Sequence, residues 1–171
     1  MHALYLLLSS MILLLDNTRA DCPHLRPGLL KWSSSETWGS EGEPTEGENV
    51  VISQNILLDK SPTSLYNITI LAGGSLIFNP EVKMELRARN IFVQGIMEIG
   101  SEDCPYNGTL TITLTGNRQD HLYEENAKVL LVEAGRTLEI HGEPRLSWTK
   151  LNKTLLSPKQ TDDVYFDHEL E

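Results

Sequence analysis

Short apolar runs separated by glycine and turn residues dominate the chain after residue 49. They are rich in Val, Ile and Leu and too short for helices, so they are typical of strands. The runs are Val50–Ile52, Ile56–Leu58, Ile68–Ile70, Leu76–Phe78, Ile91–Val93, Met97–Ile99, Leu110–Leu114, Val129–Val132 and Leu138–Ile140. Where apolar and polar residues alternate, as over 109–114, one face of the expected strand is apolar. The pattern predicts an all-β domain, with helix supported only weakly, at 124–128.

A repeat organises these runs. Three segments share one plan, in which apolar-x-apolar stretches flank a glycine: 68–78 around Gly74, 91–99 around Gly95 and 129–140 around Gly135. Together with Gly116, these glycines are separated by 21, 21 and 19 residues. A period near this length is typical of stacked coils in a β-solenoid, where glycine allows tight corners. A β-sandwich with glycine-rich turns has similar turn spacing and is the alternative fold.

The first 20 residues have the features of a secretory signal peptide. The apolar run from Leu4 to Leu15 is too short to span a bilayer as a helix, and Thr18-x-Ala20 fits a cleavage site. The residues before the run lack Lys and Arg, so an uncleaved anchor stays an alternative. No second hydrophobic segment follows, and we expect a product without a transmembrane segment, secreted or held at the cell surface by a longer isoform.

The composition divides the chain into four segments. We expect a signal peptide over 1–20, an irregular leading segment over 21–49, the β domain over 50–155, and an acidic flexible tail over 156–171. The leading segment is rich in Pro, Gly, Ser, Thr and Glu, and we expect Trp32 and Trp38 to pin it to the domain.

The two cysteines of the chain, Cys22 and Cys104, both follow the predicted cleavage site. An even pair in an exported chain is most simply one disulfide, which over so long a loop would stabilise the fold by roughly 4 to 5 kcal/mol. Two free thiols are the alternative. A zinc site is not supported, because two distant cysteines lack the paired spacing that zinc sites use.

Three Asn-x-Thr sequons agree with an oxidising, extracellular destination, at Asn67, Asn107 and Asn152. Each tripeptide arises often by chance, so their value is joint. A glycan at each site requires the asparagine to face solvent. The sequence thus predicts a glycoprotein with these three acceptors on its surface.

The chain is an anion, with 24 acidic and 14 basic residues and a formal net charge of −10. Removal of residues 1–20 takes away Asp16 and Arg19 and leaves that charge unchanged. Nucleic acids and other polyanions are repelled at long range, so an acidic glycan has to be held by a local basic patch. We expect no nucleic-acid partner.

A set of segments within residues 21–155 carries a family resemblance. They are Cys22-Pro23, Pro27-Gly28-Leu29 with Trp32, Gly73-Gly74-Ser75-Leu76, Ile99-Gly100 leading to Cys104, the run from Val132 to Gly142, Leu146–Thr149 and Leu151–Leu155. These segments resemble the G8 domain, a glycine-patterned β module of secreted and cell-surface hyaluronidases and of fibrocystin-like receptors. The run from Val132 to Gly142 is more similar to the hyaluronan-depolymerising branch, whereas Trp38-Gly39 is closer to fibrocystin-like members.

The resemblance implies a short-stranded, right-handed β-helix or solenoid-like G8 domain. In the hyaluronidase branch the residues implicated in cleavage lie beyond this module, and after Leu155 the sequence diverges into its acidic tail. The resemblance therefore implies no catalytic residue in this chain.

Catalytic and metal-binding patterns are otherwise weak. Glycoside hydrolysis uses two carboxylates that face one cleft, and we expect Glu133 and Glu139 to be ordinary strand residues instead. His141 is expected to make a structural hydrogen bond at a coil corner. Three acids in turns, Asp59, Asp103 and Asp120, offer oxygen ligands, but no EF-hand loop is present. We expect no cofactor and no metal, calcium being the ion that the composition leaves open.

For saccharide binding, the sequence offers one basic and aromatic cluster, made by Arg145, Trp148, Lys150 and Lys153. We expect it to contact an acidic glycan or the next domain of a longer chain, with core packing of Trp148 as the alternative. Tyr106 and Tyr123 are further candidate aromatic platforms.

The sequence predicts a secreted or cell-surface G8 module associated with hyaluronan binding or turnover, non-catalytic as an isolated chain. Its expected partners are hyaluronan or another extracellular glycan, and downstream domains. Two alternatives stay open: an N-terminal fragment or isoform of a hyaluronan-depolymerising glycoside hydrolase, and a fragment of a fibrocystin-like receptor ectodomain.

Overall fold

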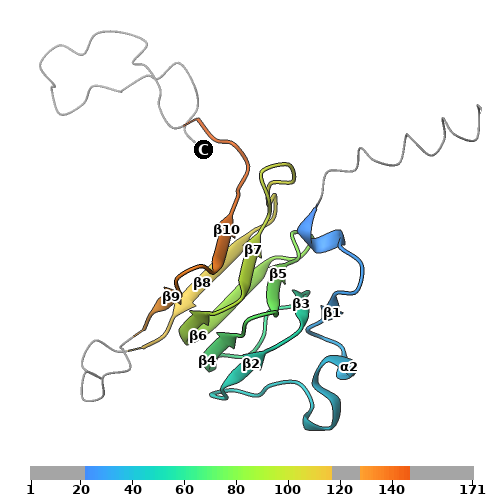
Figure 1. Ribbon diagram of the computed structural model, residues 1–171, viewed down its shortest axis with the longest axis vertical. Helices are drawn as coiled ribbons and strands as arrows, with labels where there is room; N and C mark the ends of the chain where they lie inside the picture. The colour runs from blue at the N-terminus through green and yellow to red at the C-terminus, as the bar shows by residue number, and fades with distance from the viewer. Residues whose placement is uncertain (1–21, 117–127, 147–171) are drawn as a thin grey trace, which may run out of the picture.

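Strands dominate the part of the chain that the computed structural model describes, residues 22–116 and 128–146 (Figure 1). The strands are β1 (Leu30–Lys31), β2 (Val50–Ile52), β3 (Asn55–Leu58), β4 (Leu65–Ile70), β5 (Ser75–Phe78), β6 (Met84–Val93), β7 (Ile96–Ile99), β8 (Leu110–Leu114), β9 (Leu130–Val132) and β10 (Thr137–Ile140). Three helical turns precede β2: η2 (Pro23–Leu25), α2 (Ser35–Trp38) and η3 (Gly39–Glu41). The all-β prediction is confirmed, and each predicted run contains a strand. The weak helix candidate at 124–128 lies almost wholly outside the described residues.

The strands form two sheets in which every described pair of strands is parallel. One sheet has the order β1-β3-β5-β7-β10, and the other has the order β2-β4-β6-β8, with β9 also paired to β6. Strands β2 to β7 alternate between the two sheets, so each successive pair of strands adds one layer to the stack (Figure 1). Parallel pairing favours stacked coils over a sandwich of antiparallel sheets.

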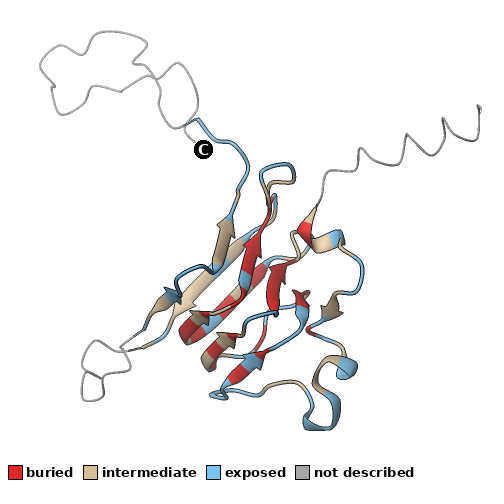
Figure 2. Ribbon diagram, viewed as in Figure 1, coloured by how far each residue is buried: buried red, intermediate tan, exposed pale blue. Residues whose placement is uncertain are grey.

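The three repeated segments of the sequence lie on top of one another. Ile68 pairs with Ile91 and Ile91 with Leu130 in one sheet, while Met97 pairs with Leu138 in the other. Their aliphatic side chains fill the space between the sheets together with Trp32, and burial is highest in the middle strands and lower in β8, β9 and β10 (Figure 2). The stack therefore has one continuous apolar core.

Strand β6 is bent, and its two halves pair with different strands. Met84–Ala88 pairs with β8, and Ile91–Val93 pairs with β9. Buried positions alternate from Met84 to Asn90 and then shift by one residue at Ile91. A side-chain period of two shifts in this way where a strand bends or bulges.

The glycines do not all occupy one corner of the stack. Gly74 and Gly95 are neighbours in register, since Ser75 pairs with Ile96. Because Thr137 also pairs with Ile96, Gly135 lies one position too early to be next in this column, in a turn with φ of +73°. Gly116 follows β8 and lies against Lys128. Of the four spaced glycines, Gly74 and Gly95 therefore share one corner, and coils of unequal length place the other two elsewhere.

The leading segment covers the outer face of the first sheet. In β7, Met97 and Ile99 belong to the core, whereas the intervening Glu98 side chain is on the opposite face and still only 6% exposed. Arg26 covers it with two hydrogen bonds, Nη1 to Oε2 at 2.6 Å and Nη2 to Oε1 at 2.9 Å. Such a two-point pair fixes orientation as well as charge. The leading segment is therefore an integral layer of the fold.

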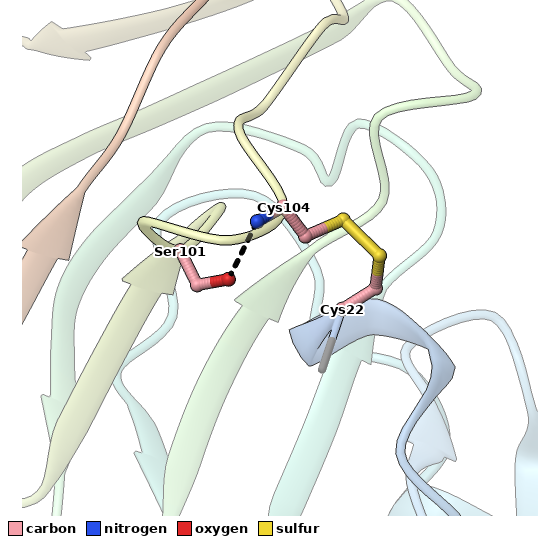
Figure 3. The surroundings of a disulfide bond; sticks show 3 residues. All are labelled: Cys22, Ser101 and Cys104. Atoms are coloured by element: carbon pink, nitrogen blue, oxygen red, sulfur yellow. Dashed lines mark hydrogen bonds between the residues drawn. A yellow bond between two sulfur atoms is a disulfide. The ribbon is translucent and has the colours of Figure 1, made fainter. Parts of the chain in front are cut away.

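A disulfide secures this layer. Cys22 directly precedes η2, and Cys104 lies in the loop between β7 and β8; their Sγ atoms are bonded across a separation of 82 residues (Figure 3). The Cys104 amide also donates to Ser101 Oγ at 3.1 Å, which holds the loop (Figure 3). The pairing predicted from the sequence is present.

Two tryptophans anchor the rest of the leading segment. Trp32 is fully buried, and its backbone N–H donates to the Leu57 carbonyl at 2.9 Å. Trp38 meets it edge to face with ring centroids 4.7 Å apart and donates from Nε1 to the Trp32 carbonyl at 2.7 Å. The pinning role predicted for the two indoles agrees with this geometry.

Candidate functional site

A hollow of about 680 Å³ lies beside the leading segment. Its lining comprises Trp38, Glu41, Gly42, Pro44, Glu48, Asn49, Val50 and Val51. The indole of Trp38 is fixed by its contacts with Trp32, and Glu48 Oε2 accepts from the Thr45 amide at 2.7 Å. One aromatic ring and two carboxylates suit a neutral or cationic ligand better than an acidic polymer, which the carboxylates would repel.

A second hollow, of about 270 Å³, lies at the corner where β4 and β6 bend. Its lining comprises Glu46, Gly47, Ser64, Leu65, Tyr66, Arg89, Thr115 and Gly116. The Arg89 guanidinium carbon lies 5.2 Å from the centroid of the Tyr66 ring, within the range of a cation–π contact. Tyr66 keeps 43% of its surface exposed. Neither residue was expected from the sequence to contribute to a site.

Two asparagines form a ladder next to this hollow. Asn67 and Asn90 are paired in register, and Asn90 Nδ2 donates to Asn67 Oδ1 at 2.8 Å. Asn90, which is 3% exposed, also accepts from the Val129 amide at 3.1 Å. The ladder satisfies polar groups where three successive coils turn the same corner.

The sequons occupy different environments. Asn67 is half-buried in β4, whereas Asn107 is exposed in the loop before β8. Asn152 lies outside the described residues. Modification of these three sites stays a prediction.

The predicted basic and aromatic cluster is only partly described. Arg145 is exposed, and its Nη2 lies 3.7 Å from Glu143 Oε2. Trp148, Lys150 and Lys153 lie outside the described residues, as does Tyr123. Tyr106 is only 7% exposed, so its prediction as an open aromatic platform is wrong. Its ring joins the core because the loop before β8 folds inward at the bridge between Tyr106 and Gly142.

Burial also governs the chemistry of Tyr106. Desolvation raises the pKa of its phenol above the ordinary 10.0. The hydroxyl donates to the Asn79 carbonyl at 3.2 Å, a bond that only the protonated form makes. Tyr106 is therefore a neutral structural residue.

The two candidate catalytic acids, Glu133 and Glu139, each contact a residue other than a second carboxylate. Glu133 Oε1 accepts from Gln94 Nε2 at 2.6 Å, and Glu139 Oε2 lies 3.8 Å from His141 Nε2. The backbone of His141 closes the coil, since its N–H donates to the Ile99 carbonyl and its carbonyl accepts from Tyr106. The structure does not bring Glu133 and Glu139 together as a described pair of converging carboxylates.

One cluster of metal-ligand types occurs among the described residues: His24, Cys22 and Cys104, whose ligand atoms lie within 4.8 Å of one another. Both sulfur atoms are committed to the disulfide, which leaves no thiolate to bind a metal.

The fold and its surface define a class: a module of stacked parallel strands, closed by a disulfide-held leading segment, with open hollows at its outer corners. The chain belongs to the G8 domain family, whose model matches residues 37–152. The resemblance seen in the sequence is thereby confirmed. Among the described residues, no helix has the length and apolar character to cross a membrane.

Named relatives come from both branches of the family. The chain is 41% identical to human fibrocystin-L over 129 residues, which is 72% of this chain and 3% of the relative. It is 36% identical to zebrafish (Danio rerio) cell surface hyaluronidase over 160 residues, 85% of this chain and 11% of the relative. It is 30% identical to the human cell migration-inducing and hyaluronan-binding protein over 153 residues, 86% of this chain and 11% of the relative. The chain thus spans a small part of each.

Proposed function

We propose that this chain is an extracellular recognition module of hyaluronan turnover, exported by its first 20 residues and non-catalytic in itself. The observation that carries the proposal is the alignment of 85% and 86% of the chain with relatives named for hyaluronan. The surface supports it, because the exposed Tyr66 ring and the Arg89 guanidinium lie together on a chain that is otherwise strongly acidic.

The non-catalytic part of the proposal rests on the acids of the described residues. Hydrolysis of a glycosidic bond uses two carboxyl groups about 5 to 9.5 Å apart on either side of the bond. Glu98 is paired with Arg26, Glu133 with Gln94, and Asp59 binds the amide and hydroxyl of Ser33. These carboxylates hold the fold together.

The test uses the purified, exported chain and high-molecular-weight hyaluronan, with retention and polymer length measured in the same incubation. We expect retention with the polymer length unchanged. Shortened polymer would contradict the non-catalytic assignment, and loss of all retention would contradict recognition. The Arg145→Ala, Lys150→Ala double variant tests the predicted C-terminal cluster, which is removed from the proposal if retention is unchanged.

Enzymatic activity is the second candidate, and one observation favours it: Glu41 and Glu48 both line the hollow beside Trp38. If the isolated chain shortens hyaluronan, the Glu41→Gln and Glu48→Gln variants identify whether these acids are responsible.

A receptor-type ectodomain is the third candidate function, and the 41% identity to fibrocystin-L favours it. Fibrocystin-like repeats read in frame beyond Glu171 would support it.

A further inference from the structure

We propose that the corner hollow between Tyr66 and Arg89 is an acidic-saccharide subsite that receives one uronate unit of a glycan. This inference rests on the proposed function and adds to it the place and chemistry of binding. The hollow lies where β4 and β6 bend, so its two main side chains come from neighbouring coils held in register by the Asn67–Asn90 pair.

The chemistry of the lining matches a uronate. Arg89 offers a guanidinium, whose planar N–H groups bind a carboxylate at two points. Tyr66 beside it keeps much of its ring open, which provides an apolar surface for the C–H face of a sugar. Ser64 and Thr115 add hydroxyls, and Gly47 and Gly116 let a ring approach the backbone closely. Glu46 is available to accept from sugar hydroxyls.

The size of the hollow limits the ligand. Its volume of about 270 Å³ falls just below the roughly 300 to 1,000 Å³ typical of pockets that enclose a drug-sized ligand. A hollow of this size suits one sugar ring of a polymer that continues over the surface on both sides.

The hollow at Tyr66 and Arg89 differs from the larger hollow beside Trp38 in its local charge. Among the described residues of its lining, the charged side chains are one cation, Arg89, and one acid, Glu46. The hollow beside Trp38 has Glu41 and Glu48, and the described residues of its lining include no cation. Since the whole chain is acidic, an acidic glycan is attracted only where a cation lies at short range, and Arg89 supplies that cation here.

The sequon at Asn67 is one residue from Tyr66, so an attached glycan has to be controlled for when binding is measured. Thr69→Val removes the sequon while leaving the Asn67 side chain and a β-branched residue in place. Binding is therefore measured on this background as well as on the natural chain.

The test is calorimetric titration with a hyaluronan octasaccharide and with a neutral chitin oligosaccharide. We expect Arg89→Gln and Tyr66→Ala each to weaken binding of the acidic ligand by roughly tenfold or more, the size of a lost charge-assisted bond. The matched control is Arg87→Gln on the same strand, since Arg87 is an exposed arginine that does not line the hollow. It should bind as the natural chain does.

Each outcome decides between the subsite and the proposed function. If the natural chain binds the octasaccharide and both variants bind equally well, the subsite is wrong and recognition stands. If the natural chain binds neither ligand in any background, both are wrong. Equal affinity for the neutral ligand overturns the acidic class. Arg89→Lys, which keeps the charge but loses the planar fork, should bind between Arg89→Gln and the natural chain, and unfolding curves verify that each variant is folded.

Discussion

Asn67 carries two functions on two atoms of one side chain. Its Oδ1 accepts from Asn90 in the corner ladder, and its Nδ2 is the atom to which an N-glycan would be attached. Because glycosylation leaves the amide oxygen in place, the ladder and the sequon are chemically compatible. A substitution at Asn67 removes both, whereas a substitution at Thr69 removes only the sequon.

This difference gives a matched pair of variants. We expect Asn67→Ala to lower the free energy of unfolding by about 1 to 3 kcal/mol, because the buried Asn90 amide loses its acceptor. Thr69→Val should show the same loss of glycan mass with little change in stability. Denaturant unfolding of enzymatically deglycosylated proteins measures the difference. Equal stability of the two variants would show that the ladder bond contributes nothing.

Tyr106 predicts a pH dependence with a definite sign. Because burial raises the pKa of its phenol in the folded chain above the ordinary 10.0, the native state holds this proton more tightly than the unfolded chain does. The associated stability is present below pH 10 and is lost as the pH rises through the folded-state pKa. Tyr106→Phe should show a shallower decline in unfolding free energy above pH 10. Identical slopes for both proteins would contradict the assignment.

Individual residues also show which contacts could be predicted from the sequence alone. The Cys22–Cys104 pair follows from compartment and number alone, so it was predictable. Tyr106 was misjudged, because a tyrosine in a turn-rich segment gives no sign that its loop folds inward. Tyr66 and Arg89 were missed because they lie one coil apart, and only the register of β4 and β6 brings them together.

The elements were predicted well where one apolar run forms one strand. Two strands are exceptions. β1 (Leu30–Lys31) lies in the segment that was expected to be irregular, and the second half of β6 was recognised from Ile91–Val93 while Met84–Ala88 was not. The signal was present, since Met84, Leu86 and Ala88 alternate with polar residues, but a short strand of this composition does not stand out from a turn. The buried positions shift next to Asn90, whose side chain accepts a hydrogen bond from the Val129 amide of another coil, a contact that no local pattern reveals.

The corner between sheets depends on glycine at one column in particular. A Cβ added to Gly95 would lie 2.3 Å from the Leu71 carbonyl oxygen and 2.4 Å from that of Gly74, and backbone atoms of neighbouring coils cannot move aside cheaply. We expect Gly95→Ala to cost about 1 to 3 kcal/mol or more. At Gly142 an added Cβ meets nothing within 4 Å, so Gly142→Ala should stay within about 0.5 kcal/mol. Thermal unfolding compares the two, and similar melting temperatures would contradict the close packing of the column.

At the scale of the whole molecule, the leading segment and the stack depend on each other. The stack leaves Glu98 on the outside of its first sheet, and Arg26 is the group that neutralises it there. The leading segment has few elements of its own and is held by the stack through Trp32 and the disulfide. The predicted boundary at residue 50 therefore separates two sequence compositions that share one fold.

The disulfide should act mainly on the unfolded chain. Cross-linking residues separated by 82 positions removes conformational freedom worth roughly 4 to 5 kcal/mol on the chain-entropy model. We expect the Cys22→Ser, Cys104→Ser double variant to lose most of that stability in denaturant unfolding. The natural chain after reduction should lose a similar amount, because both treatments free the same loop. If reduction destabilises the chain much less than the double substitution, the loss comes instead from packing of the serines beside η2, and the loop-closure account is wrong. A second outcome is that mass analysis of the exported chain shows two free thiols. The leading segment is then held to the stack by Arg26 and Trp32, and we expect Arg26→Met to detach it.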